Sequence, residues 1–309
     1  AVVLLTSGNH DSAVRLGFGT RVWERAGVHL RTRVADLGRP VELRDAYGSV
    51  LLYGLPYLEP ALTADELGAE RTHTGVLTAA MDRVRADLAQ RPGVRAVVTG
   101  HAFVVGAETS DSERDISVGG VASVASSVFG GVDYVALGHL HGRQRISETV
   151  RYSGSPLAYS FSEHRHVKGS WLVELGADGV TRVEPVPAPV PRPLAILRGR
   201  LDDLLRGDVH ADAEPAWCQV TLTDPVRPRE AMAQLRRRFP HALVLTFQPD
   251  VDARAAAGYA QRVHGQSELD VCCGFLEHVR GGATADGLER ELMRSALEAA
   301  GRQAALGAA

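Results

Sequence analysis

The sequence VVLLTSGNHDS at residues 2–12 decides the fold, because an apolar run stops at a glycine and polar side chains follow at once. Apolar, β-branched runs of this length are typical of buried strands. In open α/β sheets, ligands gather beyond the carboxyl ends of the strands. Asn9 offers a neutral oxygen, His10 a titratable imidazole and Asp11 a charge. The end of this strand is therefore a candidate binding site.

Two later stretches have the same form, a strand-like run followed by glycine and histidine. The sequence VRAVVTGH occupies residues 94–101, and VDYVALGHLH occupies residues 132–141. In an extended His-x-His segment both imidazoles point to the same side, so His139 and His141 can each reach one of two adjacent ions. Three strands that end in this way predict one polynuclear metal site.

The predicted ligands suit the hydrolysis of phosphate esters. Asn9, His101, His139 and His141 combine amide and imidazole donors, which favour Mn²⁺, iron or Zn²⁺ over Mg²⁺ or Ca²⁺. Two such ions about 3.5–4 Å apart bind a phosphate, generate hydroxide near neutral pH and stabilise the leaving oxygen. The other histidines lack this context and are expected to be surface or structural residues: His29, His73, His164, His166, His210, His241, His264 and His278.

Composition places the chain among ordinary globular proteins. Of its 309 residues 45% are hydrophobic and 23% charged, and the formal net charge is −3, so an anionic partner must be met by a local basic patch. We find no run long enough to span a membrane and no signal peptide. The three cysteines form no disulfide framework or zinc motif, which favours a cytoplasmic protein with reduced thiols. Cys272 and Cys273 are expected to be small apolar fillers.

Strand-like and helix-like stretches alternate along the chain, which indicates an α/β fold. The first part contains strand signals at residues 28–30, 40–43, 49–57 and 150–156, the last ending in small residues, a helix signal at 72–91, and a hairpin signal at 169–186. Prolines alternate through residues 184–193, which predicts a stiff linker.

A second, smaller pattern follows this linker. Strands are expected at residues 194–198, 217–223 and 242–248, and helices at 201–206 and 228–239. Amphipathic helical sequence continues from about residue 267. We therefore expect three parts, a first domain at 1–186, an α+β domain at 194–265 and a helical segment at 266–309.

The motifs at residues 8–11, 100–101 and 138–141 together resemble the calcineurin-like metallophosphoesterases. Their longer context narrows this resemblance to SbcD, the nuclease subunit family of the bacterial SbcCD complex. This context comprises TGH at 99–101, residues 110–115, VGG at 118–120, DYVALGH at 133–139, RYSGSP at 151–156 and SELD at 267–270. The resemblance covers nearly the whole chain.

The resemblance implies a sandwich of two sheets flanked by helices, then a DNA-capping domain and a helical tail. It implies two divalent ions, most simply Mn²⁺, with Asn9, His101 and His139 on one ion and His141 on the other. His10 would sit over the phosphate and protonate the leaving 3′ oxygen. Asp11 is expected either to orient the ligands from behind or to cap the following helix, for which Ser12 is the other candidate cap.

The implied activity is that of a double-strand exonuclease and single-strand or hairpin endonuclease in DNA repair, recombination and replication. The implied partners are DNA, an SbcC-type ATPase docked on the tail, and a second copy of the chain in a heterotetramer. Basic residues after the linker are candidates for backbone contacts with DNA: Arg227, Arg229, Arg236, Arg237 and Arg238.

The sequence departs from the family in one respect. SbcD proteins begin with Asp-x-His and then Gly-Asp-x-x-Asp, whose first Asp bridges the metals, and both motifs should precede Val2. Because the chain opens within a strand without Met, we expect that an N-terminal segment is missing. The second metal then keeps His141 alone, so we expect this polypeptide to be a poor nuclease and its full-length parent a competent one. The alternatives are a small-molecule phosphodiesterase of the same fold and an inactive binding subunit.

Overall fold

A computed structural model describes residues 1–111, 113, 123–250, 265–280 and 282–307. Residues 118–120 and His264, which the sequence analysis used, lie outside these ranges. The described chain divides into two compact units. One unit comprises Ala1–Arg198, Asp202–Thr221 and Glu230–Thr246, and the other Gly199–Leu201, Leu222–Arg229 and Phe247–Ala309. The domain boundaries expected from the sequence stay predictions.

A six-stranded sheet with the order β3-β4-β5-β8-β10-β9 forms the centre of the first unit. Its four inner strands run parallel, and the edge strands β3 and β9 are antiparallel to their neighbours. The strands are β3 (Val41–Asp45), β4 (Gly48–Gly54), β5 (Arg95–His101), β8 (Tyr134–Gly138), β9 (Gln144–Arg145) and β10 (Val150–Tyr152). The predicted α/β class is confirmed at this level.

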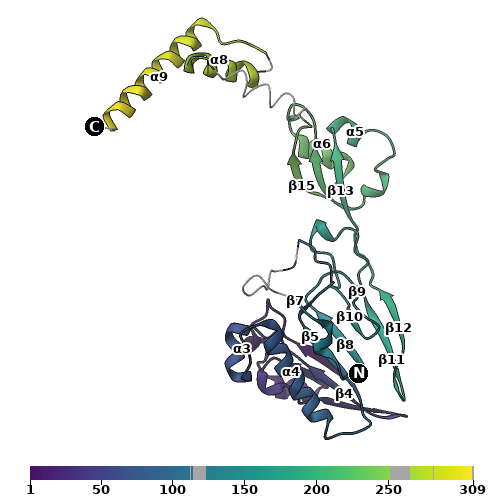
Figure 1. The fold of residues 1–309 in the computed structure, drawn as a ribbon. Helices are drawn as coiled ribbons and strands as arrows, with labels where there is room; N and C mark the ends of the chain where they lie inside the picture. Colours follow the sequence, from purple (N-terminus) through teal and green to yellow (C-terminus); the bar gives the residue numbers. More distant parts are fainter. Residues whose placement is uncertain (112, 114–122, 251–264, 281, 308–309) are drawn as a thin grey trace. The chain divides into compact units, whose positions relative to one another are not determined.

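Helices α3 (Pro60–Leu67) and α4 (His73–Leu88) cover one face of this sheet (Figure 1). The Thr72 side chain caps α4 by accepting a hydrogen bond from the Gly75 amide. The predicted apolar stripe of α4 is buried in the main core: Val76, Leu77, Ala80, Met81 and Val84. The Tyr53 hydroxyl of β4 donates to Asp87 Oδ2 at 2.7 Å, which ties the end of the helix to the sheet.

The predicted hairpin forms from β11 (Gly169–Gly176) and β12 (Gly179–Pro187). Trp171 Nε1 donates to the Tyr152 carbonyl oxygen at 2.9 Å, so the hairpin is anchored to the sheet. Strand β12 includes Pro185, so the linker predicted to begin at residue 184 begins later. Among the described strands β12 pairs with β11 alone, and an edge strand tolerates prolines that lack an amide donor.

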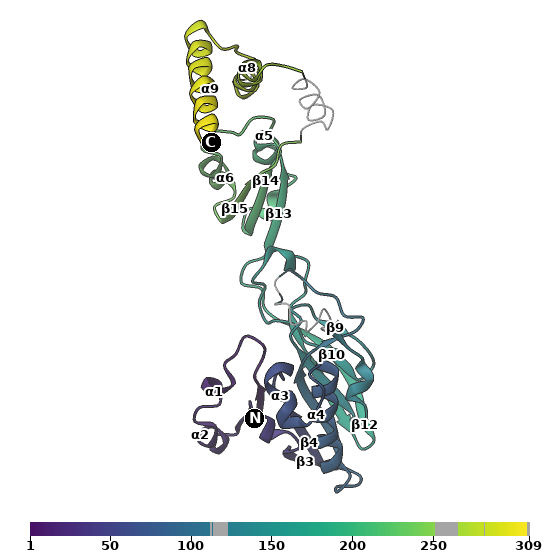
Figure 2. The ribbon, with the colours of Figure 1, turned by 60° about the vertical axis from the view of Figure 1, so that its left-hand side comes forward.

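Strand β1 (Val3–Thr6) pairs in parallel with β2 (Val28–Arg31). Its predicted burial is wrong, since Val3 is 40% and Leu5 45% exposed. The reason is that, within the described chain, β2 is the sole strand that hydrogen-bonds to β1. Two short helices follow β1, α1 (Ala13–Leu16) and α2 (Thr20–Arg25) (Figure 2). A further small parallel pair is formed by β6 (Phe103–Val104) and β7 (Ser123–Val124).

The predicted α+β pattern appears as a three-stranded sheet of β13 (Leu194–Gly199), β14 (Trp217–Leu222) and β15 (Ala242–Phe247). Helices α5 (Leu201–Leu205) and α6 (Ala231–Arg238) accompany it. Helix α6 begins later than residue 228, because Glu230 adopts a left-handed φ of 48° that is incompatible with continuous helix.

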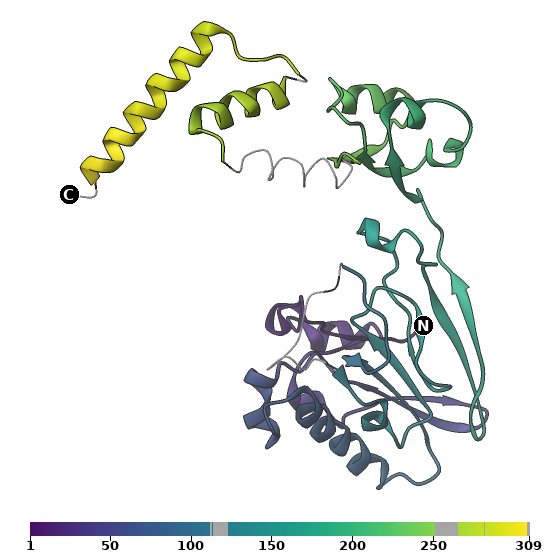
Figure 3. The ribbon, with the colours of Figure 1, turned by 45° about the horizontal axis from the view of Figure 1, so that its top comes forward.

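The predicted helical tail consists of α8 (Glu268–Val279) and α9 (Gly287–Gly307) (Figure 3). Ser267 caps α8 through the Asp270 amide. Arg280 forms a two-point ion pair with Glu289 at 2.9 and 2.7 Å, which joins the two helices. Cys273 is buried and Cys272 half-buried in α8. In the part of the chain that the structure describes, no helix is both long and apolar enough to cross a membrane.

Candidate metal centre

The candidate centre lies where β1, β5 and β8 end. His101 is the last residue of β5 and pairs in register with Gly138, the last residue of β8. Because β5 and β8 are parallel neighbours, His101 and His139 emerge at the same sheet edge. Their ring centroids are 5.3 Å apart. The sequence analysis therefore correctly predicts that His101 and His139 lie close together.

Asn9 reaches the same point from the end of β1. Its Oδ1 lies 2.8 Å from Nε2 of His101. Its Nδ2 is buried and finds no hydrogen-bond partner among the described residues. An unsatisfied buried amide is costly, so this geometry indicates a site that holds the amide oxygen in a fixed direction.

Two glycines make room for the His101 imidazole. A Cβ on Gly8 would stand 2.8 Å from His101 Cε1, and a Cβ on Gly138 would stand 3.2 Å from its Nδ1. The ring therefore packs directly against the backbone at Gly8 on one side and at Gly138 on the other. This contact explains why glycine precedes the polar residues at the ends of β1 and β8.

Burial keeps both imidazoles neutral. Burial, and after it the nearby His139, lower the pKa of His101 from 6.5 to about 4. Burial also lowers the pKa of His139, against an opposing effect of Glu113. Neutral imidazoles retain the lone pair that a metal ligand needs.

The backbone of His139 is strained. Its φ of 106° is unusual for a residue with a side chain and costs about 1–3 kcal/mol. Such strain is common at functional sites, where the surrounding structure enforces a side-chain direction. Here the strained residue is the one that points its ring toward His101.

The remaining histidines of the predicted set belong to the same neighbourhood. Positive charge on His10 or His141 would lower the pKa values of both His101 and His139, so the four imidazoles interact. His10 is exposed, and the His141 side chain is 26% exposed. An exposed His10 beside half-buried imidazoles is accessible to a substrate.

Asp11 closes the turn that carries Asn9. Its Oδ2 accepts a hydrogen bond from the Gly8 amide at 2.7 Å. The helix cap is Ser12, which accepts a bond from the Arg15 amide, so the alternative role of Asp11 as the cap of α1 is wrong. In the structure, Asp11 thus stabilises the turn at residues 8–11 that contains Asn9.

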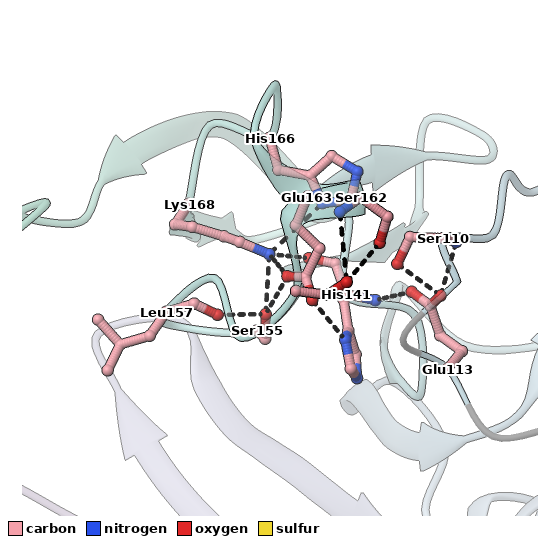
Figure 4. Close-up of polar contacts among 10 residues, drawn as sticks. Ser110, Glu113, His141, Ser155, Leu157, Ser162, Glu163, His166 and Lys168 are labelled. Carbon is pink, nitrogen blue, oxygen red and sulfur yellow. Dashed lines mark hydrogen bonds and ion pairs between the residues drawn. The ribbon is translucent and has the colours of Figure 1, made fainter. Parts of the chain in front are cut away.

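Sequence reasoning missed a buried ionic group beside His141 (Figure 4). Glu163 is fully buried and forms an ion pair with Lys168 at 2.5 Å. Glu163 Oε1 lies 3.2 Å from His141 Nδ1, and Glu113 Oε1 accepts a bond from the His141 amide at 2.7 Å. That amide bond and bonds from Ser110 hold the pKa of Glu113 below its usual range, although burial opposes this. The one available signal was that Lys168 is the single lysine in the sequence.

The donor set fits one divalent ion better than two. Asn9, His101 and His139 supply an amide oxygen and two neutral imidazoles, a set that accepts Mn²⁺, iron or Zn²⁺. Across the described ranges, no three His, Cys, Asp or Glu side chains gather as a metal site, so a second ion would have His141 without a partner carboxylate.

The candidate DNA-contacting arginines are not all exposed to solvent. Arg238 is 13% exposed and bonds to Glu214 and to the carbonyl oxygens of Leu204 and Arg206. Exposed residues of the set are Arg227, Arg229, Arg236 and Arg237. Arg238 is thus better explained as a structural residue of the three-stranded module.

Comparison with known families bears on the C-terminal half. Residues 190–280 match the SbcD_C family, described as "Type 5 capsule protein repressor C-terminal domain". The matched segment runs from the start of β13 through α8 and does not include the candidate metal centre. It supports an SbcD-like protein, in agreement with the resemblance found in the sequence.

Proposed function

We propose that the chain is a metal-dependent nuclease subunit of SbcD type, with a calcineurin-like first domain, a DNA-capping module and a partner-docking tail. The observation that carries the proposal is the meeting of Asn9, His101 and His139 at one sheet edge, in a chain whose residues 190–280 match SbcD_C. Both observations are needed, because the residues that match SbcD_C do not include the candidate metal centre.

The described residues have separate roles in the proposed reaction. Asn9, His101 and His139 would hold one Mn²⁺, and His141 would face the other. When bound, the metals supply hydroxide and charge stabilisation for phosphodiester hydrolysis. The exposed His10 donates a proton to the leaving 3′ oxygen. The buried rings stay neutral because burial disfavours their protonation.

The proposed substrate is duplex DNA, held by its phosphates, and the proposed partners are an SbcC-type ATPase and a second copy of the chain. The exposed arginines of the C-terminal module would contact the DNA backbone without reading bases. The tail would dock the ATPase through the apolar face of α8.

A second candidate is a subunit that binds DNA and partner without cutting. One observation favours it for this polypeptide, since among the described residues no three His, Cys, Asp or Glu side chains gather as a metal site. The two candidates differ in whether cleavage occurs, not in which surfaces bind.

Cleavage of linear duplex DNA with Mn²⁺, with and without an SbcC-type ATPase, tests the proposal. We expect slow, Mn²⁺-dependent cleavage that His10→Gln reduces about 10²–10⁴-fold, while His210→Gln, outside the centre, does not. Cleavage that His10→Gln leaves unchanged would overturn the proposed role of His10. Binding of the ATPase without any cleavage would support the second candidate, and turnover of bis-(p-nitrophenyl) phosphate without DNA cleavage would indicate a small-molecule phosphodiesterase.

A further inference from the structure

We propose that the buried pair of Glu163 and Lys168 positions His141, holding its ring in one tautomer and one direction. The inference rests on the proposed function, in which His141 is a metal ligand. It assigns a task to two residues that lie outside every motif found in the sequence. They act through His141 and are positioning residues.

His141 is held at three points of its own structure (Figure 4). Its amide donates to Glu113 Oε1 at 2.7 Å, and its carbonyl oxygen accepts a bond from Lys168 Nζ at 2.8 Å. Its Nδ1 faces Glu163 Oε1 at 3.2 Å. The Ser155 amide also donates to the His141 carbonyl oxygen, at 3.1 Å. Backbone and ring are therefore both fixed, with Lys168 in contact with the backbone and Glu163 with the ring.

The Glu163 contact selects a tautomer. An ionised carboxylate accepts hydrogen bonds and cannot donate them, so Nδ1 of His141 must carry the proton. The lone pair is then on Nε2, which Figure 4 shows on the side of the ring away from Glu163. Carboxylates commonly orient metal-binding histidines in this way.

Lys168 holds Glu163 in place through an ion pair. Its ammonium lies 2.5 Å from Glu163 Oε2, 2.8 Å from the His141 carbonyl oxygen and 2.9 Å from Ser155 Oγ. An ammonium group has three donors, and these are its three shortest contacts; His166 Nδ1 lies farther away, at 3.4 Å. Everywhere else in the sequence the long-chain cation is arginine, so this position uses the compact point charge that a buried three-way contact requires.

The loop geometry that brings the pair to His141 depends on Gly154. Its φ of 81° suits glycine, and a Cβ there would stand 2.7 Å from the His141 carbonyl oxygen. The backbone after β10 therefore passes directly over the backbone of His141. Ser155 Oγ then donates to Glu163 Oε2 at 3.4 Å, and Glu163, in the short helical turn Phe161–Glu163, faces the His141 ring.

Ring ¹⁵N spectra of histidine in the metal-free protein test the inference without activity. The His141 signals are identified by their loss in His141→Gln. We expect a protonated Nδ1 and an unprotonated Nε2 in the wild type. A wild-type protein with the proton on Nε2 would overturn the inference, whatever the variants do.

Two double variants test the pair without leaving a lone buried charge. Glu163→Met with Lys168→Met removes both charges and the acceptor, and we expect mixed tautomers. Glu163→Gln with Lys168→Met restores an acceptor for Nδ1, and we expect the wild-type tautomer to return. Wild-type ring signals in the first variant would contradict the inference. Arg95→Met, which breaks the buried contact with Asp45 in the same unit, is the control for general loss of stability and should leave the His141 signals unchanged.

Mn²⁺ added to the same samples separates this inference from the proposed function. We expect the ion to broaden the His141 signals in the wild type, and the concentration for half-broadening to rise about 10- to 100-fold in the Met–Met variant. Broadening that is equal in both proteins contradicts the positioning role. A correct tautomer without any broadening contradicts the proposed function and leaves the orientation of His141 established.

Discussion

Nε2 of His101 lies 2.8 Å from Oδ1 of Asn9, although the two residues are 92 positions apart in the chain. The contact joins the end of β1 to the end of β5 through side chains that both serve as metal ligands in proteins. A purely structural bond would not require the strained φ of 106° at His139, the next ring in the cluster. The strained backbone agrees with the binding site that we propose for this cluster.

The space that Gly8 leaves for His101 predicts the effect of adding one methyl group. Gly8→Ala would place Cβ 2.8 Å from His101 Cε1, so we expect a loss of about 1–3 kcal/mol in the free energy of unfolding and weaker Mn²⁺ binding. Urea unfolding and calorimetric Mn²⁺ titration measure the two effects.

Gly100→Ala is the matched control for this substitution. Gly100 neighbours His101 in β5, but its added Cβ would meet Leu55 at an ordinary 3.6 Å. We expect little change in stability or metal binding. Equal effects of the two substitutions would contradict the view that Gly8 is reserved for the imidazole.

The depressed pKa of His101 predicts how stability depends on pH. Burial and the neighbouring His139 lower this pKa from 6.5 to about 4, so between these values the unfolded chain binds the proton more readily than the folded one. Above pH 6.5 His101 is unprotonated in both states and does not affect the free energy of unfolding. As the pH falls to about 4, the unfolded chain takes up the proton and the free energy of unfolding decreases by on the order of 3 kcal/mol.

Urea unfolding of the metal-free protein at pH 7.5 and 4.5, with and without His101→Asn, checks this pH dependence. We expect the wild type to lose more stability on acidification than the variant. The same loss in both proteins would show that His101 is not the group responsible.

Arg237 and Arg238 are adjacent but should respond differently to substitution by alanine. Arg238 bonds to Glu214 and two carbonyl oxygens, so Arg238→Ala should lower the free energy of unfolding by about 1.5–3 kcal/mol. Arg237 is exposed, so Arg237→Ala should leave stability within about 0.5 kcal/mol.

The same pair of variants tests the proposed DNA contact. If Arg237 binds a phosphate, Arg237→Ala reduces the salt dependence of duplex binding by about one unit of slope. Fluorescence anisotropy at several salt concentrations measures this slope. An unchanged slope would remove Arg237 from the proposed DNA surface.

The three cysteines should differ in reactivity toward a thiol reagent. Cys218 is fully buried and burial raises its pKa, whereas Cys272 is half-buried. Thiolates are the reactive form, so Cys272 should react first and Cys218 only on unfolding. Timed labelling with mass spectrometry measures the order, with Cys272→Ala as the control. Early labelling of Cys218 would contradict the packing of the three-stranded module.

The sequence predicts the candidate centre well where a strand ends. His101 and His139 follow apolar runs and a glycine, and parallel neighbours necessarily end at one edge. The amphipathic pattern of α4 likewise predicts its buried face, because the spacing of its apolar residues follows the helical repeat.

Other features could not be predicted because they depend on contacts distant in sequence. Glu163 and Lys168 lie in irregular backbone, where no periodic pattern indicates burial, and their partner His141 is more than 20 positions away. The exposure of Val3 and Leu5 depends on which strands flank β1, and residue type alone does not reveal that.

Pulsed electron paramagnetic resonance of the protein with bound Mn²⁺ tests the central claim most directly. We predict one tightly bound Mn²⁺ per chain, held by Asn9, His101 and His139, with coupling to imidazole nitrogen that is lost in the double variant His101→Ala with His139→Ala. The second proposed ion, which would have His141 without a partner carboxylate, should bind more weakly. Mn²⁺ that binds without nitrogen coupling, or with a coupling that the double variant retains, would contradict the account.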